Sequence, residues 1–289
     1  NGGQVVIQPS PGVSPATQPG VSPIPIPPRP PASPPAPPPI PIPNPTPNPS
    51  PTPTPIPPAP PAGAFTLPPA TGRTLQANTT NYTQVISTLK AGDTLELASG
   101  SYPRLLLSGL NGTANNWIYV KGQPDRSTII FNPESSGAYD TLDIRRSSYL
   151  AVMNFTVDGR NQGNHAISMN AGPCHHILIQ DNVIKNTSDH QQSVGISTTS
   201  GGTVWDIVIR RNIIMDAGTG MYLGDSTGGS PFIGGIVENN LVYPTLGYNI
   251  QVKFQKTRSI VAGAPTEPRK TIIRNNVFIK DSRTGTDGA

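Results

Sequence analysis

Tyr149-Leu-Ala-Val-Met-Asn154-Phe-Thr-Val157 is the first of five similar stretches that decide the fold of this chain. Each stretch contains a short β-prone run, an asparagine and a second β-prone run, and the other four begin at Ile177, Ile207, Gly235 and Thr271. The asparagines lie 28, 30, 28 and 36 residues apart, at Asn154, Asn182, Asn212, Asn240 and Asn276. A repeat of this length is typical of stacked supersecondary units, each of which buries its apolar face against the next. The pattern therefore predicts a solenoid of β-strands.

We interpret the recurring asparagine as structural. At the turn of a coil, asparagine can adopt the left-handed backbone conformation, and its amide can bond the backbone and the asparagine of the next coil. Stacked amides of this kind form a ladder that satisfies buried polar groups along the axis. We therefore expect function to lie elsewhere on the coils.

The first 63 residues differ in composition from the rest of the chain. Of the 37 prolines, 27 fall in residues 1–61, where Arg29 is the only charged residue. A packed core cannot form there, because proline removes backbone donors and few bulky side chains are present. We predict a Pro-rich linker over residues 1–63, either a polyproline II stalk or a disordered tail. Residues 64–289 form the predicted folded domain, which we expect to be truncated at its C-terminus.

The start of the folded part has a recognisable order of elements. Residues 81–92 predict a short helix that ends at Gly92, residues 93–97 alternate as a strand, and Gly100-Ser-Tyr102 predicts a turn. This order resembles the N-terminal cap of right-handed parallel β-helix proteins of the pectate-lyase-like superfamily. The resemblance covers nearly all of residues 74–281 and is closest to uncharacterised secreted bacterial members related to polysaccharide lyases. It implies an all-β, right-handed parallel β-helix with a short N-terminal capping helix, and the same scaffold carries many activities.

A second strand in each coil predicts a polar strip on the surface. Alternation of residues along these strands separates inward from outward side chains. The expected inward residues are Leu142, Ile144, Ile167, Met169, Ile196, Thr198, Met221, Leu223, Ile250 and Val252. One outward column then contains Asp143, Ser168, Ser197, Tyr222 and Gln251, and the other contains Arg145, Asn170, Thr199, Gly224 and Lys253. An exposed tyrosine beside amides and hydroxyls suits a sugar ring, although a solvated sheet face has similar residues.

Lys253 is the candidate catalytic residue on this strip. Elimination from a uronic acid needs a base that removes the proton next to the carboxylate, and a cation that neutralises the carboxylate. A lysine among other cations can act as such a base. The position of Lys253 resembles that of the catalytic lysine in the alginate lyase and chondroitinase B family. We name Tyr222, Gln251, Arg145, Lys256 and Arg258 as candidate substrate-binding residues; the last two belong to a basic insertion at residues 256–270.

The metal signal is weak. Single loop carboxylates that could hold calcium are Asp189, Asp216, Asp225 and Glu238, and Asp225 is the best candidate because it follows the Tyr222 strand. The alternative reading of Asp225 is a turn-forming residue beside glycine. No Asp-Asp pair occurs, which argues against a polygalacturonase-type hydrolase.

Charge and composition narrow the range of functions that the chain could have. The net charge of +4 comes from scattered basic residues without the basic and aromatic stripe of a nucleic-acid-binding protein. No apolar run is long enough to span a membrane, and the single cysteine, Cys174, is interpreted as a small buried or turn residue and not as a nucleophile. We predict a monomeric, secreted or cell-surface protein whose partner is a polysaccharide. Two hypotheses remain open: a polysaccharide lyase on an acidic glycan, or a non-catalytic carbohydrate-binding or adhesive protein.

Overall fold

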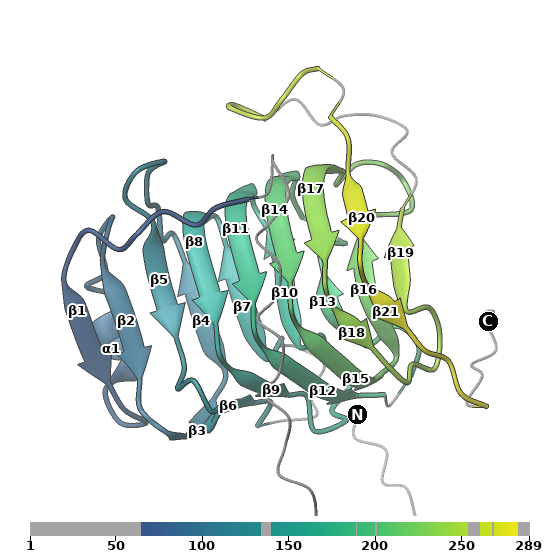
Figure 1. Ribbon diagram of the computed structural model, residues 1–289, viewed down its shortest axis with the longest axis horizontal. Coiled ribbons are helices and arrows are strands. Elements are labelled where there is room, and N and C mark those ends of the chain that lie inside the picture. The colour runs from purple at the N-terminus through teal and green to yellow at the C-terminus, as the bar shows by residue number, and fades with distance from the viewer. Residues whose placement is uncertain are drawn as a thin grey trace, which may run out of the picture. The chain divides into compact units, whose positions relative to one another are not determined.

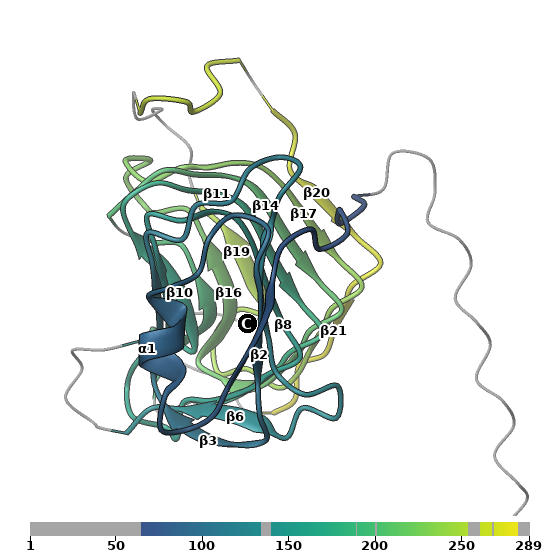
Figure 2. The ribbon, with the colours of Figure 1, turned by 90° about the vertical axis from the view of Figure 1, so that its left-hand side faces the viewer.

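Three parallel sheets run along one axis in the computed structural model. It describes residues 65–133, 140–188, 190–199, 201–253, 261–267 and 269–282. The Pro-rich segment predicted over residues 1–63 lies outside these residues. All strand pairings are parallel, and the chain visits the sheets in turn, so that each coil adds one strand to each sheet it passes (Figures 1 and 2). This is the architecture of a parallel β-helix, as the repeat predicts.

The sheets differ in length. Sheet A contains β1 (Thr74–Ala77), β2 (Thr94–Leu97), β5 (Ile118–Lys121), β8 (Ser148–Met153), β11 (Cys174–Gln180), β14 (Val204–Arg210), β17 (Phe232–Glu238) and β20 (Ile272–Arg274). Sheet B contains β3 (Gly100–Pro103), β6 (Thr128–Phe131), β9 (Thr156–Asp158), β12 (Val183–Thr187), β15 (Ile213–Ala217), β18 (Leu241–Val242) and β21 (Val277–Phe278). Sheet C contains β4 (Leu105–Ser108), β7 (Leu142–Arg145), β10 (Ile167–Ala171), β13 (Val194–Ser197), β16 (Thr219–Leu223) and β19 (Ile250–Val252).

The core lies inside the coils and consists mainly of leucine, isoleucine and valine. The inward residues predicted for β7, β10 and β16, together with Ile196 and Thr198, are fully buried. Ile250 is partly buried against the core, whereas Val252 is 42% exposed. Val252 was expected to point inward and be covered, but it lies on β19, the last strand of sheet C in the described chain, so no further strand packs over it.

An asparagine ladder joins sheet A to sheet B. Asn182 donates its amide hydrogen to Oδ1 of Asn212 (3.0 Å), Asn212 donates to Asn240 (3.0 Å), and Asn240 donates to Asn276 (2.9 Å). The backbone N–H of each also donates to the Oδ1 of the next asparagine. The predicted ladder is confirmed for these four residues.

Asn154 is not part of the ladder, which corrects the prediction for the first repeat. The backbone N–H of the next residue, Phe155, donates to Oδ1 of Asn182 (3.0 Å), so the apolar Phe155 occupies the ladder position. Asn154 instead adopts a left-handed backbone conformation (φ 63°), as do Asp181 and Arg211, the residues directly before ladder asparagines. The left-handed residue is therefore the one before the ladder asparagine and not the asparagine itself.

One short helix precedes the first complete coil. Helix α1 (Tyr82–Ile86) begins after Asn81, whose side chain makes no capping bond within the helix. Tyr82 and Ile86 are buried in the core, and Gly92 has the left-handed φ of 91° that a turn at this point requires. Figure 2 shows α1 at the end of the coils where β1 and β2 lie.

Two further sequence expectations can be compared with the structure. Cys174 is fully buried, and its burial raises the pKa of its thiol, as expected for a structural cysteine. Within the described residues, no helix has the length and apolar composition needed to cross a bilayer.

Candidate functional site

The outward column on sheet C has the register that alternation predicts. The Cα pairings join Asp143 to Ser168, Ser168 to Ser197, Ser197 to Tyr222 and Tyr222 to Gln251. The first three are buried, however, with exposures of 1%, 0% and 0%. Only Tyr222 and Gln251 are partly exposed. The first column is thus exposed only at its C-terminal end, whereas Arg145, Asn170, Thr199 and Lys253 of the second column are all partly exposed.

A pocket lies at this open end, with a volume of about 260 Å³. Its lining residues come from β16, β19 and three loops; they are Gln191, Gln192, Thr219, Tyr222, Ser226, Tyr248, Gln251 and Lys253. The structure therefore brings together three of the residues predicted from the sequence, namely Tyr222, Gln251 and Lys253. Among the described residues that line the pocket, Lys253 is the only basic or acidic one. The others carry amide, hydroxyl or phenol groups.

Lys253 is held at the end of β19 by its backbone and by an aromatic ring. Its N–H donates to the carbonyl of Leu223 on β16 (2.8 Å). Its Nζ lies 4.8 Å from the centroid of the Tyr222 ring, which is cation–π distance. The Tyr222 hydroxyl lies 3.1 Å from Oγ of Ser226. The ammonium group, the phenol and the hydroxyl are thereby fixed along one side of the pocket.

The opposite wall was not predicted from the sequence. Gln191 and Gln192 project from the loop between β12 and β13, and the hydroxyl of Thr219 donates to the carbonyl of Gln191 (3.0 Å). Tyr248, which is 40% exposed, precedes β19. The only sequence signal for this wall was the length and polarity of the loop at residues 186–193. His190 of that loop bonds Ser193 and the N–H of Gln192 and does not line the pocket.

Arg145 lies outside the pocket. Its Nε and Nη2 donate to Oδ2 of Asp143 (2.8 and 2.5 Å), and Arg104 donates to the same oxygen (3.0 Å). The hydrogen bond to Asp143 raises the pKa of the Arg145 guanidinium. Arg145 is on β7, three strands from β16, which corresponds to about 14 Å at the usual strand spacing. In this geometry Arg145 neutralises the buried carboxylate of Asp143.

Asp225 is bonded by its own loop. Oδ1 accepts the N–H of Thr227 (3.1 Å) and of Gly228 (2.6 Å), and Oδ2 accepts the N–H of Ser230 (2.9 Å). Burial acts to raise the pKa of the Asp225 carboxyl, but these hydrogen bonds together hold it below its ordinary value. This is the turn-forming arrangement that was the alternative reading. Calcium at Asp225 stays a prediction, and the described residues contain no group of three or more His, Cys, Asp or Glu side chains placed to hold a metal ion.

The remaining candidates lie elsewhere. Lys256, Arg258 and Asp189 fall outside the described residues. Glu238 is on sheet A, where it pairs with Arg274 (2.8 Å).

Sugar rings suit the chemistry of this pocket. Amides and hydroxyls can donate to and accept from the hydroxyls of a saccharide, while the phenol rings of Tyr222 and Tyr248 offer apolar surface. The ammonium group of Lys253 favours a saccharide that carries a carboxylate or another anionic substituent.

Comparison with known proteins gives a likeness in fold. No protein-family profile and no curated protein matches the chain. A mutant of the PL6 family alginate lyase AlyGC is similar over 70% of this chain and 38% of its own length, with 15% identity and a TM-score of 0.39. An alginate lyase from Paenibacillus sp. is similar over 75% of this chain and 96% of its own (12% identity, TM-score 0.35). The pectate lyase Pel9A is similar over 75% and 80% (10% identity, TM-score 0.35).

The assignment of a parallel β-helix to this chain comes from its own strand pairings. The chain spans about two fifths of the length of the AlyGC mutant. Identities of 10–15% concern the fold alone and leave the pocket to be judged from its own residues.

Proposed function

We propose that this protein acts on an acidic polysaccharide and binds one of its uronate units in the pocket of Tyr222, Gln251 and Lys253. The observation that carries the proposal is the position of the Lys253 ammonium beside the Tyr222 ring, in a pocket whose other described lining residues are amides, hydroxyls and phenols. In this arrangement the sugar ring packs on a phenol face, its hydroxyls bond the glutamines, and its carboxylate meets Lys253. An extracellular polymer as ligand agrees with the expected secreted or cell-surface location.

The finer proposal is that Lys253, when it loses its proton and no longer pairs with the carboxylate, is the base of a β-elimination. The neutral amine removes the proton from the carbon next to the carboxylate, and this electron pair forms a double bond to the neighbouring carbon. The glycosidic C–O bond on that carbon breaks, and the leaving oxygen takes a proton from the Tyr222 hydroxyl or from water. The position of Tyr222, beside Lys253 and in contact with Ser226, supports this assignment.

The second candidate is non-catalytic binding of the same polymer. It is favoured by the presence of one charged group in the described pocket lining, because elimination is served best by a base and a separate cation. In this candidate Lys253 stays charged and acts only as the partner of the carboxylate.

Three proteins distinguish these roles: the unmodified chain, Lys253→Arg and Lys253→Ala. Each is incubated with alginate, pectate and chondroitin, and the ultraviolet absorbance of the unsaturated product is followed alongside binding of uronate oligosaccharides. If Lys253 is the base, Lys253→Arg keeps binding but forms no product, since a guanidinium does not give up its proton at neutral pH. Product that persists in Lys253→Ala would exclude Lys253 as the base.

A matched control is available on another face. Lys121 also lies over an aromatic ring, with its Nζ 5.5 Å from the centroid of Tyr119 on sheet A. Lys121→Ala removes the same kind of contact far from the pocket and should leave binding and product unchanged. Binding by the unmodified chain without product from any of the three polymers would select the non-catalytic candidate.

A further inference from the structure

A column of apolar side chains covers the outer face of sheet A, on a different face from the saccharide pocket. The Cα register joins Tyr119, Ala151, Leu178, Val208, Ile236 and Ile272, one from each of six neighbouring strands. Outward residues on a solvated sheet are usually polar, so an unbroken apolar column indicates a face that is covered.

The chain itself covers the first part of this column. Residues 65–68 cross the strands of sheet A from β14 to β5 (Figure 1). Phe65 and Leu67 pack on Trp117, Tyr119, Ala151, Leu178 and Val208, while Thr66 between them is exposed. Two carbonyls are bonded on the way: that of Phe65 accepts from Arg210 Nη1 (2.9 Å), and that of Pro68 accepts from the Tyr119 hydroxyl. This face therefore binds an extended segment through alternate apolar side chains and through donors to its carbonyls.

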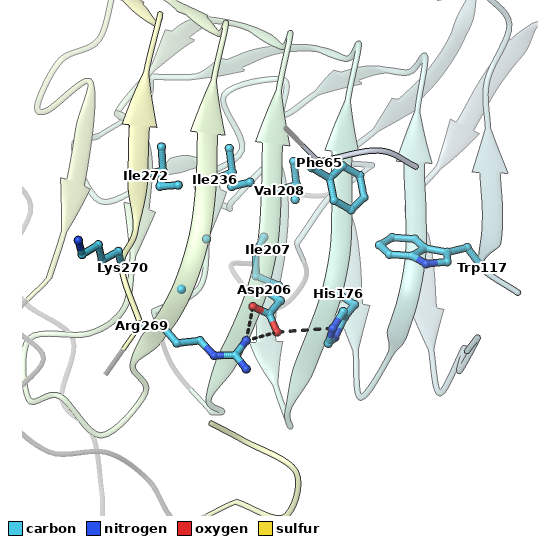
Figure 3. A pocket seen from close by; sticks show the side chains of 12 residues that line it. Phe65, Trp117, His176, Asp206, Ile207, Val208, Ile236, Arg269, Lys270 and Ile272 are labelled. Carbon is cyan, nitrogen blue, oxygen red and sulfur yellow. Dashed lines mark hydrogen bonds and ion pairs between the residues drawn. The ribbon is translucent and has the colours of Figure 1, made fainter. Parts of the chain in front are cut away.

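The column continues beyond Phe65 without such a cover in the described residues. Val208 is 4% exposed, Ile236 is half-buried and Ile272 is 42% exposed. Here lies a groove of about 510 Å³ that starts at Phe65 and passes over Val208, Ile236 and Ile272. Figure 3 shows these four side chains in one row across the strands.

One wall of the groove is polar. On one side, Asp206 lies 3.5 Å from Nε2 of His176 and 2.6 Å from Nη1 of Arg269, as the dashed lines in Figure 3 mark. Next to the floor, outside the lining of the groove, Glu238 on β17 is paired with Arg274 on β20 (2.8 Å) and lies 3.9 Å from Arg210 on β14. Arg274 thus repeats, beside Ile272, the position from which Arg210 bonds the Phe65 carbonyl beside Val208.

We propose that this groove binds an extended peptide segment of another polypeptide, with apolar residues at alternate positions and proline nearby, in the manner of residues 65–68. The floor formed by Ile236 and Ile272 takes the apolar side chains, and Arg274 donates to a carbonyl. The argument is the continuity of the groove with the interface already formed by Phe65 and Leu67: the same column and the same kind of arginine extend past the end of the covered part. The groove spans the strands from β14 to β20, about 10 Å, which corresponds to three extended residues.

A labelled synthetic peptide, Ala-Phe-Thr-Leu-Pro-Pro, tests the proposal on the full chain by fluorescence polarisation. We expect saturable binding that Ile272→Glu weakens at least tenfold, because the substitution puts a charge on the floor in place of an apolar side chain. Val277→Glu is the matched control: Val277 is 52% exposed but lies on β21 of sheet B, and this variant should bind as the unmodified chain does.

Specificity is tested with a peptide in which serine replaces both phenylalanine and leucine; we expect it not to bind. The absence of saturable binding to the full chain would overturn the proposal. This outcome would also be observed if the chain's own residues occupied the groove, and it would then still exclude a segment of another polypeptide as the occupant. Equal weakening by Ile272→Glu and Val277→Glu, or binding that neither changes, would overturn the assignment to this groove. The saccharide assays do not involve this face, so failure here leaves the proposed function standing.

Discussion

Replacement of Asn212 by alanine tests the ladder as the element that holds the coils in register. The Asn212 amide donates to the carbonyl of Ile179 and to Oδ1 of Asn240, and its Oδ1 accepts the N–H and the side-chain amide of Asn182. Asn212→Ala therefore removes four hydrogen bonds at a site that is 1% exposed. Each is worth about 1 kcal/mol net, and buried groups left unpaired cost more, so we expect a loss of about 3–6 kcal/mol in the free energy of unfolding.

Asn154→Ala is the matched control, because Asn154 belongs to the same sequence repeat but lies outside the ladder. Its left-handed φ of 63° is less favourable for alanine than for asparagine, and we expect the substitution to lower the free energy of unfolding by about 1 kcal/mol. Urea unfolding can be followed by the fluorescence of Trp117 and Trp205, both buried on sheet A. Similar losses for the two variants would refute the distinction between ladder and non-ladder asparagines.

Three further predictions concern the sheet A face and the pocket. Burial, together with the nearby His176, lowers the pKa of His175 to about 4 in the folded chain. The unfolded chain, in which the pKa is about 6.5, therefore binds the proton more readily. The stabilising contribution is complete above about pH 6.5 and is lost as the pH falls toward 4. Since His175 is only partly buried, we discount the full shift and expect a loss of about 1–2 kcal/mol, measured by urea unfolding across this range and reduced in His175→Phe. Gly218→Ala should weaken saccharide binding severalfold in calorimetry, because a Cβ there would lie 1.9 Å from the carbonyl of His190 and displace the Gln191 loop; unchanged affinity would argue against that loop as a wall. Arg145→Ala should leave saccharide binding unchanged in the same assay. It should lower the free energy of unfolding by only about 1 kcal/mol, since Arg104 still pairs with Asp143. Weakened binding would show that Arg145 contributes to the saccharide site.

Much of the fold could be predicted because a solenoid repeats its constraints. Alternation along each strand placed Ile167, Met221 and their equivalents inward, and the same alternation put Tyr222 beside Gln251, as the register confirms. Asn154 misled because an asparagine is equally favourable at the left-handed position one residue before the ladder. The hydrogen bond from Phe155 to Asn182 and the register of Thr156 with Val183 distinguish the two positions.

The site was harder to predict, because its walls do not repeat. Gln191, Gln192 and Tyr248 belong to loops between strands, and no period brings them next to Lys253. Arg145 was placed on the correct face, but alternation cannot say which part of that face is open. The burial of Asp143 beneath Arg104, which is 39 residues away in the sequence, is one contact that the alternation does not reveal.

The central claim is that Lys253 gives the pocket its preference for an acidic saccharide. Calorimetric titration of the unmodified chain and of Lys253→Ala, each with a uronate oligosaccharide and with its carboxyl-reduced counterpart, tests this claim most directly. We predict that the unmodified chain binds the acidic form about tenfold more tightly, a difference of about 1.4 kcal/mol, and that Lys253→Ala binds the two forms alike. A preference for the acidic form that persists in Lys253→Ala, or that the unmodified chain lacks, would contradict the account.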